Sequence, residues 1–372
     1  MEDNAILIIS TAVVMCCIVM ATVFLSLPLP TKRELNKYRI SLRFLTGAYL
    51  LMALLKIYLM VFDVKLINII SIENLLLSVS QALLFSTALI TLLNPKFDAF
   101  SFLRNKIFVL IVLMLSYLIL SLWWENPEIS TFESLKENLW QPCIIVRQIT
   151  LLYYIYLLIV LTKEFQTQEK NYLKEIDNYY ADNSTLKLTW VKYCFYAALI
   201  IGLIALSSFI IISEVFSLYI DVIFTLFYLF FGLFYIQYPR TFEFIEPTFI
   251  TIDGQGADIS KNTKRNNWSE LKAQILSEKY YLTKSVNIAD MAQHLKIGRT
   301  SLSNMINNEE KMNFNSWINM MRIEEAKRII NDKPNINMAN VAETVGYSEL
   351  SNFSKQFKIC TGKTPSSWRP KQ

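Results

Sequence analysis

The sequence has little of what a metal site or a disulfide framework requires. Its 372 residues include one histidine, His294, and five cysteines. The number of cysteines is odd, four of them lie in apolar runs, and their spacing matches neither a zinc site nor a disulfide framework. His294 lies on a predicted helix without a second ligand candidate, so we expect it to be a surface or half-buried structural residue. The sequence therefore predicts no metal, no cofactor and no metal-dependent catalysis.

Catalytic signatures are missing as well. The sequence has no phosphate-binding P-loop, no protein-kinase catalytic signature and no helix with the His-Glu spacing of zinc proteases. Enzyme functions therefore rank last, and we expect a protein that is not an enzyme.

Long apolar runs dominate the first two-thirds of the chain. Because a helix needs about 20 mostly apolar residues to cross a bilayer, seven stretches are candidate membrane spans. They run from about Ala5 to Leu27, Ile40 to Phe62, Leu66 to Leu93, Ile107 to Trp123, Leu139 to Leu161, Val191 to Ile212, and Val215 to Tyr235. The first follows two acidic residues, is too long for a signal peptide and precedes no small-residue cleavage site, so we predict a retained helix.

Basic residues between these stretches alternate in number. The first, third and fifth loops hold four, three and four of them: Lys32, Arg33, Lys37 and Arg39; Lys96, Arg104 and Lys106; Lys163, Lys170, Lys174 and Lys187. The second and fourth loops hold one each, and the N-terminal segment and the sixth loop hold none. Because Lys and Arg concentrate on the cytoplasmic side of a membrane, this alternation predicts an outside N-terminus and a cytoplasmic C-terminus. We expect a multi-pass protein of a bacterial cytoplasmic membrane.

Eight polar side chains lie within the apolar stretches: Arg43, Lys56, Glu73, Asn74, Gln81, Arg147, Gln148 and Asp221. Of these, Glu73, Arg147 and Asp221 lie deeper than the rest. Ionisable groups inside a membrane face protein or water and often mark functional sites. One interpretation is an internal ion pair or hydrogen-bond network that holds the bundle together. The other is a ligand pocket centred on Arg147, with Gln148 and the Tyr153-Tyr154 pair nearby, through which the bundle senses a signal. Both interpretations stay open at this point.

The composition changes abruptly after Tyr238-Pro239-Arg240. Residues 241–267 contain a proline, two glycines and several Asn, Ser and Asp residues, which is typical of a linker. Residues 1–252 hold 18 Lys and Arg against 19 Asp and Glu, whereas residues 253–372 hold 18 against 12, a net charge of +6. We therefore predict a membrane domain over residues 1–240, the linker, and a basic domain over residues 268–372 that suits a polyanion.

One segment of the basic domain has a helix-turn-helix pattern. Asn287 caps a predicted helix through Leu295, and Gly298 provides the turn. A second helix is expected from Arg299 to Asn307, and a longer amphipathic helix from Phe314 to Ile330. A helix-turn-helix motif reads DNA from the major groove.

The same pattern recurs about 50 residues later, a distance that indicates internal duplication of one motif. Gly346 permits the turn of the second copy, and we expect Leu350, Phe353 and Phe357 to anchor its second helix in the core. Single helix–glycine–helix patterns occur in many globular domains. Two copies joined by one amphipathic helix are a far more specific signal, and they predict DNA binding.

The second copy carries the signature Val341-Ala-Glu-Thr-Val-Gly-Tyr-Ser-Glu-Leu-Ser-Asn-Phe-Ser-Lys-Gln-Phe-Lys, followed by Gly362-Lys-Thr-Pro-Ser-Ser-Trp-Arg369. Together with Met321-Arg-Ile-Glu-Glu-Ala326 in the joining helix, this signature resembles the DNA-binding domain of the AraC/XylS family. The resemblance extends from about Trp268 to Arg369. It implies two recognition helices that enter successive major-groove segments on one face of the duplex, about 34 Å apart.

Two positions of the first copy depart from the family pattern. Gly298 stands where the family usually has a helix-capping serine, and Lys311 replaces a common glycine in the turn before Phe314. The apolar half of the chain does not resemble the family's usual soluble sugar-binding module. The resemblance therefore implies nothing about what the chain senses.

Candidate DNA contacts lie on the outward faces of the second helix of each copy. Arg299 is the candidate for bidentate recognition of guanine, and Asn352 for recognition of adenine. The other residues expected to face DNA are Thr300, Ser303 and Asn304 in the first copy, and Ser348, Glu349, Ser351 and Lys355 in the second. The candidate phosphate contacts, which set affinity and register without reading sequence, are Lys358, Lys363 and Arg369. The alternative for each residue is an ordinary solvated surface position.

We therefore predict an all-α protein in which a seven-helix transmembrane bundle is joined to a double helix-turn-helix domain. The leading hypothesis is a membrane-embedded, one-component transcription regulator. Its expected partners are double-stranded promoter DNA, the lipid bilayer, RNA polymerase, an unknown small-molecule or membrane signal, and a second copy of the chain. One alternative makes the bundle a receptor or transporter whose C-terminal domain docks a protein. Another makes the bundle an inert anchor.

Overall fold

A computed structural model describes most of the chain, and it is helical throughout. The described residues are 2–27, 36–61, 69–94, 97–181, 188–208, 214–236 and 268–369. Within these ranges the regular structure consists of helices and one isolated bridge between Tyr180 and Asn287, with no strand. The predicted all-α class is confirmed, and the predicted linker at 241–267 lies outside the described residues.

The chain divides into two compact units. The first comprises Met1–Lys170 and Leu188–Glu243, and the second comprises Asn171–Lys187 and Phe244–Gln372. This division differs from the predicted one in one respect. The segment Asn171–Lys187, which follows the fifth apolar stretch, belongs to the C-terminal unit.

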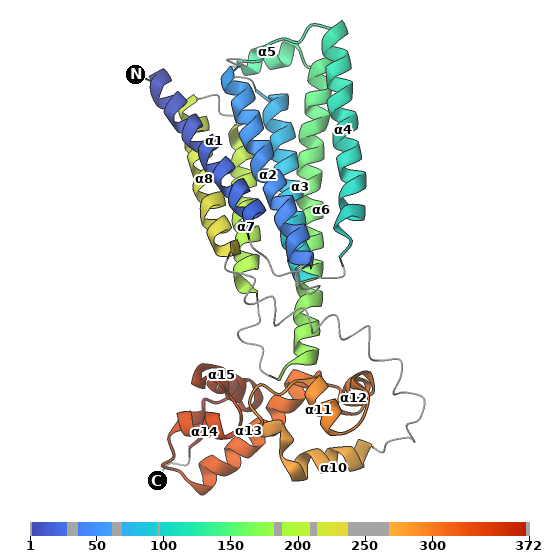
Figure 1. The fold of residues 1–372 in the computed structure, drawn as a ribbon, viewed down its shortest axis with the longest axis vertical. Helices are drawn as coiled ribbons and strands as arrows, with labels where there is room; N and C mark the ends of the chain where they lie inside the picture. The colour runs from blue at the N-terminus through green and yellow to red at the C-terminus, as the bar shows by residue number, and fades with distance from the viewer. Residues whose placement is uncertain are drawn as a thin grey trace. The chain divides into compact units, whose positions relative to one another are not determined.

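The first unit is a bundle of long helices (Figure 1). They are α1 (Glu2–Ser26), α2 (Asn36–Val61), α3 (Ile72–Leu93), α4 (Ala99–Trp123), α6 (Pro142–Tyr179, with residues 142–170 in this unit), α7 (Thr189–Ser208) and α8 (Glu214–Ile236). All seven are long and apolar enough to cross a membrane. A short helix, α5 (Phe132–Glu137), begins with a capping box between Thr131 and Ser134 and was not predicted.

Packing within the bundle makes α3 its central helix. This helix contacts α2, α4 and α7, while α1 packs against α2 and α8. In α3 the polar side chains Gln81, Ser86, Thr87 and Thr91 are buried along with the apolar ones. In α4, by contrast, only Ala99, Leu103 and Tyr117 are buried. The outer surface of the bundle is therefore largely apolar.

Helix α6 is longer than predicted. The expected span ended at Leu161, but the helix continues to Tyr179. The added residues are mostly polar helix formers without glycine or proline, and Phe165, Tyr172 and Ile176 are buried at helical spacing. A search for apolar runs stops where this amphipathic pattern begins.

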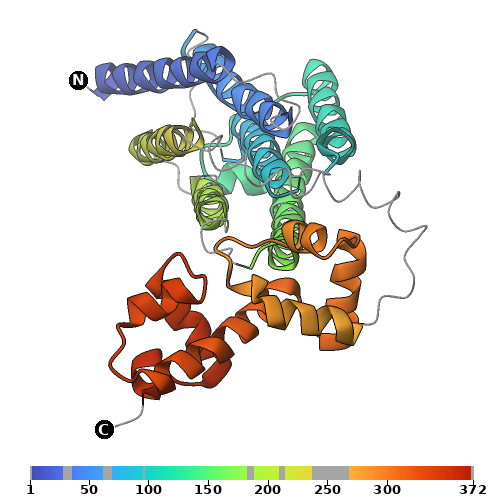
Figure 2. The ribbon, with the colours of Figure 1, turned by 60° about the horizontal axis from the view of Figure 1, so that its bottom comes forward.

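The second unit contains two helix-turn-helix motifs at opposite ends of one helix, α13 (Figure 2). Its elements are α10 (Trp268–Glu278), η2 (Tyr280–Leu282), α11 (Ile288–His294), α12 (Arg299–Met305), η3 (Ile306–Glu310), α13 (Phe314–Asp332), α14 (Met338–Thr344), α15 (Leu350–Thr361) and α16 (Pro365–Trp368). The first part of α13, through Met321, packs into the core of the first motif. From Ile323 onward the same helix packs into the core of the second motif.

One predicted core residue of the second motif is wrong. Leu350 is 44% exposed, whereas Phe353 and Phe357 are fully buried as expected. Leu350 is the first residue of α15, and the buried ring of Tyr347 packs 5.5 Å from Phe353. Tyr347, which lies in the turn, therefore takes the core position that was expected for Leu350.

Candidate nucleic-acid interface

The first motif presents the start of α12. Asn287 caps α11, since its Oδ1 accepts a hydrogen bond from the Asp290 amide at 2.9 Å. Gly298 precedes α12 in an extended conformation and, having no side chain, makes no capping hydrogen bond. The burial of Leu302 and Ile306 fixes the inward face of the helix. On the other face Thr300 and Asn304 are exposed, while Arg299 and Ser303 are half-buried.

The departure of the first motif from the family pattern at Lys311 has a structural counterpart. The chain leaves α12 through the π-turn η3, and Lys311 then adopts a left-handed conformation with φ of 55°. Glycine enters this region without steric penalty, whereas other residues rarely do. The turn is held by Glu310, whose carboxylate accepts hydrogen bonds from Trp268 Nε1 at 2.8 Å and Lys272 Nζ at 2.7 Å.

The second motif presents α15. Gly346 makes the preceding turn with φ of +88°. A Cβ at this position would lie 2.4 Å from the carbonyl oxygen of Leu282, so the turn accepts glycine alone. Because Phe353 and Phe357 point inward, the outward face of α15 carries polar side chains. Of these, Ser351 and Lys355 are exposed and Asn352 is half-buried. Ser348 and Glu349, which directly precede α15, are exposed as well.

The candidate phosphate contacts fall into two groups. Lys358 and Lys363 are exposed near the C-terminal end of α15. Arg369 is half-buried, and its guanidinium donates a hydrogen bond to the carbonyl oxygen of Ile336. Arg369 thus has a structural contact that the sequence did not indicate.

Arg322, to which the sequence pattern assigned no function, joins the two motifs. Arg322 is fully buried in α13 between the two cores. Its Nε donates to the Tyr281 carbonyl at 2.7 Å and its Nη2 to the Thr283 carbonyl at 2.8 Å. Its guanidinium also lies 5.3 Å from the ring centroid of Tyr347. The only sequence signal was a basic residue at a core position of an amphipathic helix.

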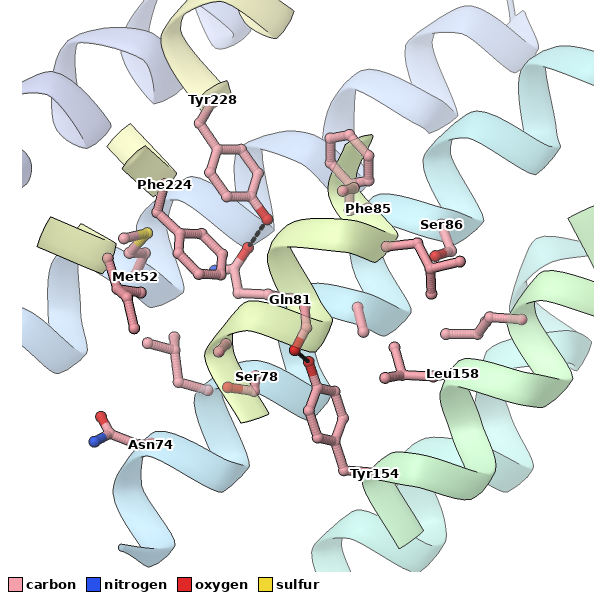
Figure 3. Close-up of a pocket in the computed structure, with 18 of the residues that line it drawn as sticks. Met52, Asn74, Ser78, Gln81, Phe85, Ser86, Tyr154, Leu158, Phe224 and Tyr228 are labelled. Atoms are coloured by element: carbon pink, nitrogen blue, oxygen red, sulfur yellow. Dashed lines mark hydrogen bonds between the residues drawn. The ribbon is translucent and has the colours of Figure 1, made fainter. Parts of the chain in front are cut away.

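In the bundle, Asp221 lies at a cavity of about 100 Å³ lined by α2, α3, α6, α7 and α8 (Figure 3). Its carboxylate pairs with Lys56 Nζ at 2.5 Å, and both side chains are largely buried. Tyr228 donates to Gln81 Oε1 at 3.0 Å, and Tyr154 donates to the Gly202 carbonyl at 3.3 Å. The cavity therefore combines an ion pair, phenol and amide groups with an apolar wall.

Glu73, Arg147 and Gln148 do not line this cavity. Arg147 is 4% exposed, donates to Asn126 Oδ1 at 2.5 Å and lies 5.8 Å from the ring centroid of Tyr117. Its Nε and Nη1 are buried without a hydrogen-bond partner among the described residues. Glu73 and Gln148 are half-buried. The structure therefore separates Asp221 from Arg147.

Comparison with known proteins identifies the C-terminal part. Residues 291–371 match the family profile described as a helix-turn-helix domain. The Arabinose operon regulatory protein of Salmonella typhimurium is 32% identical over 83 residues, which cover 22% of this chain and 29% of that protein. The Msm operon regulatory protein of Streptococcus mutans is 27% identical over 85 residues, or 23% of this chain and 30% of its own length. The Regulatory protein PocR of Salmonella typhimurium is 24% identical over 101 residues, or 27% and 33%.

These matches cover about three-tenths of the relatives' length. No solved structure matches the chain significantly. The relatives are named as regulatory proteins, which agrees with the expectation that the chain is not an enzyme.

Proposed function

Because residues 291–371 form an AraC-type helix-turn-helix domain, we propose that this chain is a transcription regulator that binds promoter DNA while embedded in a bacterial cytoplasmic membrane. The observation that carries the proposal is the pair of motifs on α13, each with a buried apolar face and a polar outward face. Helices α12 and α15 would enter the major groove. RNA polymerase, the bilayer and a second copy of the chain are the further partners in this proposal.

The proposed division of labour on DNA follows from side-chain chemistry. Arg299 and Asn352 would read bases, because guanidinium and amide groups form bidentate pairs with guanine and adenine. Lys355, Lys358 and Lys363 would neutralise phosphates and so set affinity without reading sequence. Glu349 stands at the N-cap of α15 and accepts a hydrogen bond from Ser351 at 3.1 Å. We assign Glu349 to orienting Ser351 as well as to facing DNA.

Substitutions separate base reading from phosphate binding. We expect Asn352→Ala to weaken binding to the preferred sequence by about 1–3 kcal/mol and to relax specificity at one position. Lys358→Ala should instead weaken binding to all sequences alike and reduce the salt slope by about 1. Fluorescence anisotropy of the intact protein in lipid nanodiscs, with DNA taken from crosslink mapping in cells, measures both. Wild-type binding that shows no preference over competitor DNA would refute the proposal and favour a protein-docking module.

Membrane embedding is supported by surface chemistry. Seven helices are long and apolar enough to span. Apolar side chains of α4 such as Phe108, Leu118 and Leu122 are strongly exposed, which is rare on soluble proteins at this density. The alternating loop charges favour a cytoplasmic C-terminus. Several of those basic residues, including Lys32 and Arg33, lie outside the described residues.

Sensing by the bundle is the finer part of the proposal, and the cavity at Asp221 supports it. A small molecule with an apolar body and a hydrogen-bonding group suits its lining. Ala198→Phe fills the cavity. In this variant we expect transcription from a promoter that the protein binds to stay constant across growth conditions that change it in the wild type. Ala197→Phe, one position along α7 and not lining the cavity, is the matched control. A response to conditions in Ala198→Phe equal to the wild type would support an inert anchor.

A further inference from the structure

The segment that ends α6 is built into the first helix-turn-helix motif. Ala181 is 1% exposed and belongs to the same buried cluster as Met291 and Leu302. Its amide donates to the Val286 carbonyl at 3.1 Å, and Tyr180 pairs with Asn287 in the isolated bridge. The clustering of Asn171–Lys187 with the C-terminal unit has this contact as its physical basis.

Two buried asparagines of α13 recognise the backbone of this segment. Asn315 Nδ2 donates to the carbonyls of Tyr180 at 3.1 Å and Ala181 at 2.7 Å. Asn319 Nδ2 donates to the Ala181 carbonyl at 3.1 Å, while its Oδ1 accepts from Tyr347 Oη at 2.6 Å. A buried amide is unfavourable unless it is hydrogen-bonded, so these positions suit a partner that presents carbonyl oxygens.

The same segment touches the candidate base reader. The guanidinium of Arg299 lies 5.8 Å from the ring centroid of Tyr179, within cation–π range. Arg299 is the first residue of α12 and is half-buried in this position. Bidentate contact with guanine requires two N–H groups aimed at the base edge. The contact with the tyrosine ring limits the directions in which these N–H groups can point, and so competes with any base contact that needs another orientation.

We propose that Tyr179–Ala181 is a built-in docking partner of the first helix-turn-helix motif, which holds Arg299 against Tyr179 and so restrains that motif from reading DNA. The restraint rests on the proposed DNA-binding function, whereas the docking does not. The helix that carries the segment, α6, contributes residues 142–170 to the apolar unit.

If the contact between Tyr179 and Arg299 restrains DNA reading, removal of the Tyr179 side chain should raise the affinity for DNA. Tyr179→Ala should tighten binding of the intact protein to its mapped promoter fragment by about two- to five-fold, the equivalent of one exposed cation–π contact. Tyr179→Phe keeps the ring and should bind like the wild type. In an Arg299→Ala background the effect of Tyr179→Ala should vanish, because the two residues act through each other. Anisotropy titrations in nanodiscs at one fixed salt concentration measure all four variants.

Docking itself is tested by hydrogen exchange. Asn315→Ala should remove protection from the peptide that contains Ala181 while α15 amides stay protected, which verifies that the second motif remains folded. Unchanged protection at Ala181 would overturn the docking, whatever happens on DNA. Equal or weaker DNA binding by Tyr179→Ala, or a gain that persists without Arg299, would overturn the restraint. Lack of sequence preference in the wild type would instead refute the proposed function.

Discussion

Gly346→Ala is expected to lower the free energy of unfolding of the C-terminal domain by about 3 kcal/mol or more. Two penalties add. The left-handed backbone at φ of +88° costs a non-glycine residue about 1–2 kcal/mol. The new Cβ would also lie 2.4 Å from the Leu282 carbonyl and 3.0 Å from Arg322 Nη2, and the nearer atom is backbone that cannot rotate away.

The chain offers a matched control for this substitution. Gly362 has φ of +76° at the end of α15, but nothing lies within 4 Å of its would-be Cβ. Gly362→Ala should therefore cost only the backbone term of about 1–2 kcal/mol. Hydrogen exchange of α14 and α15 amides in the intact protein gives both free energies. If the two substitutions lowered the free energy of unfolding equally, the close approach to Leu282 would contribute nothing to the cost at Gly346.

Arg322→Ala is expected to have the second large effect, and to lower the free energy of unfolding of the C-terminal domain by about 3–5 kcal/mol. The substitution removes two hydrogen bonds from a charged donor, leaves the buried Tyr281 carbonyl without that donor, and opens space between the two cores. Because α13 serves both cores, we expect both motifs to lose exchange protection together. DNA binding at 37 °C should fall with the folded fraction.

Arg328→Ala is the control for Arg322. Arg328 lies on the same helix, but its side chain is 75% exposed and its contact with Glu325 is a surface pair at 3.5 Å. Such pairs contribute about 0–1 kcal/mol. If Arg322→Ala proved as mild as Arg328→Ala, the buried guanidinium would not be what joins the motifs.

Much of the C-terminal half could be predicted because its signals are local. Asn287 and Gly346 mark a helix start and a turn by their own chemistry, and Phe353 and Phe357 mark a buried face by spacing. Arg322 escaped prediction because its partners are backbone carbonyls in η2 and the following turn, which have no side-chain signature. Asn315 and Asn319 escaped prediction because both donate to backbone carbonyls of Tyr180 or Ala181, far away in the chain.

The bundle was predictable as apolar helices but not as a site. Apolar runs located all seven long helices, while the polar, amphipathic end of α6 fell outside that criterion. The pairing of Lys56 with Asp221 joins residues far apart in the chain, and a single sequence gives no distance between them. For the same reason the expected grouping around Arg147 anticipated only Tyr154 among the residues that line the cavity.

The sharing of α13 has a consequence for the promoter. Because both helix-turn-helix cores are built on the single helix α13, the separation of α12 and α15 is fixed by the folded domain and not by a tether. B-form DNA turns about 35° per base pair, so one extra base pair between the two half-sites would rotate one of them away from its reader. Under the proposed function, a DNA site read by both motifs should therefore tolerate base changes in its spacer far better than a change in the length of that spacer.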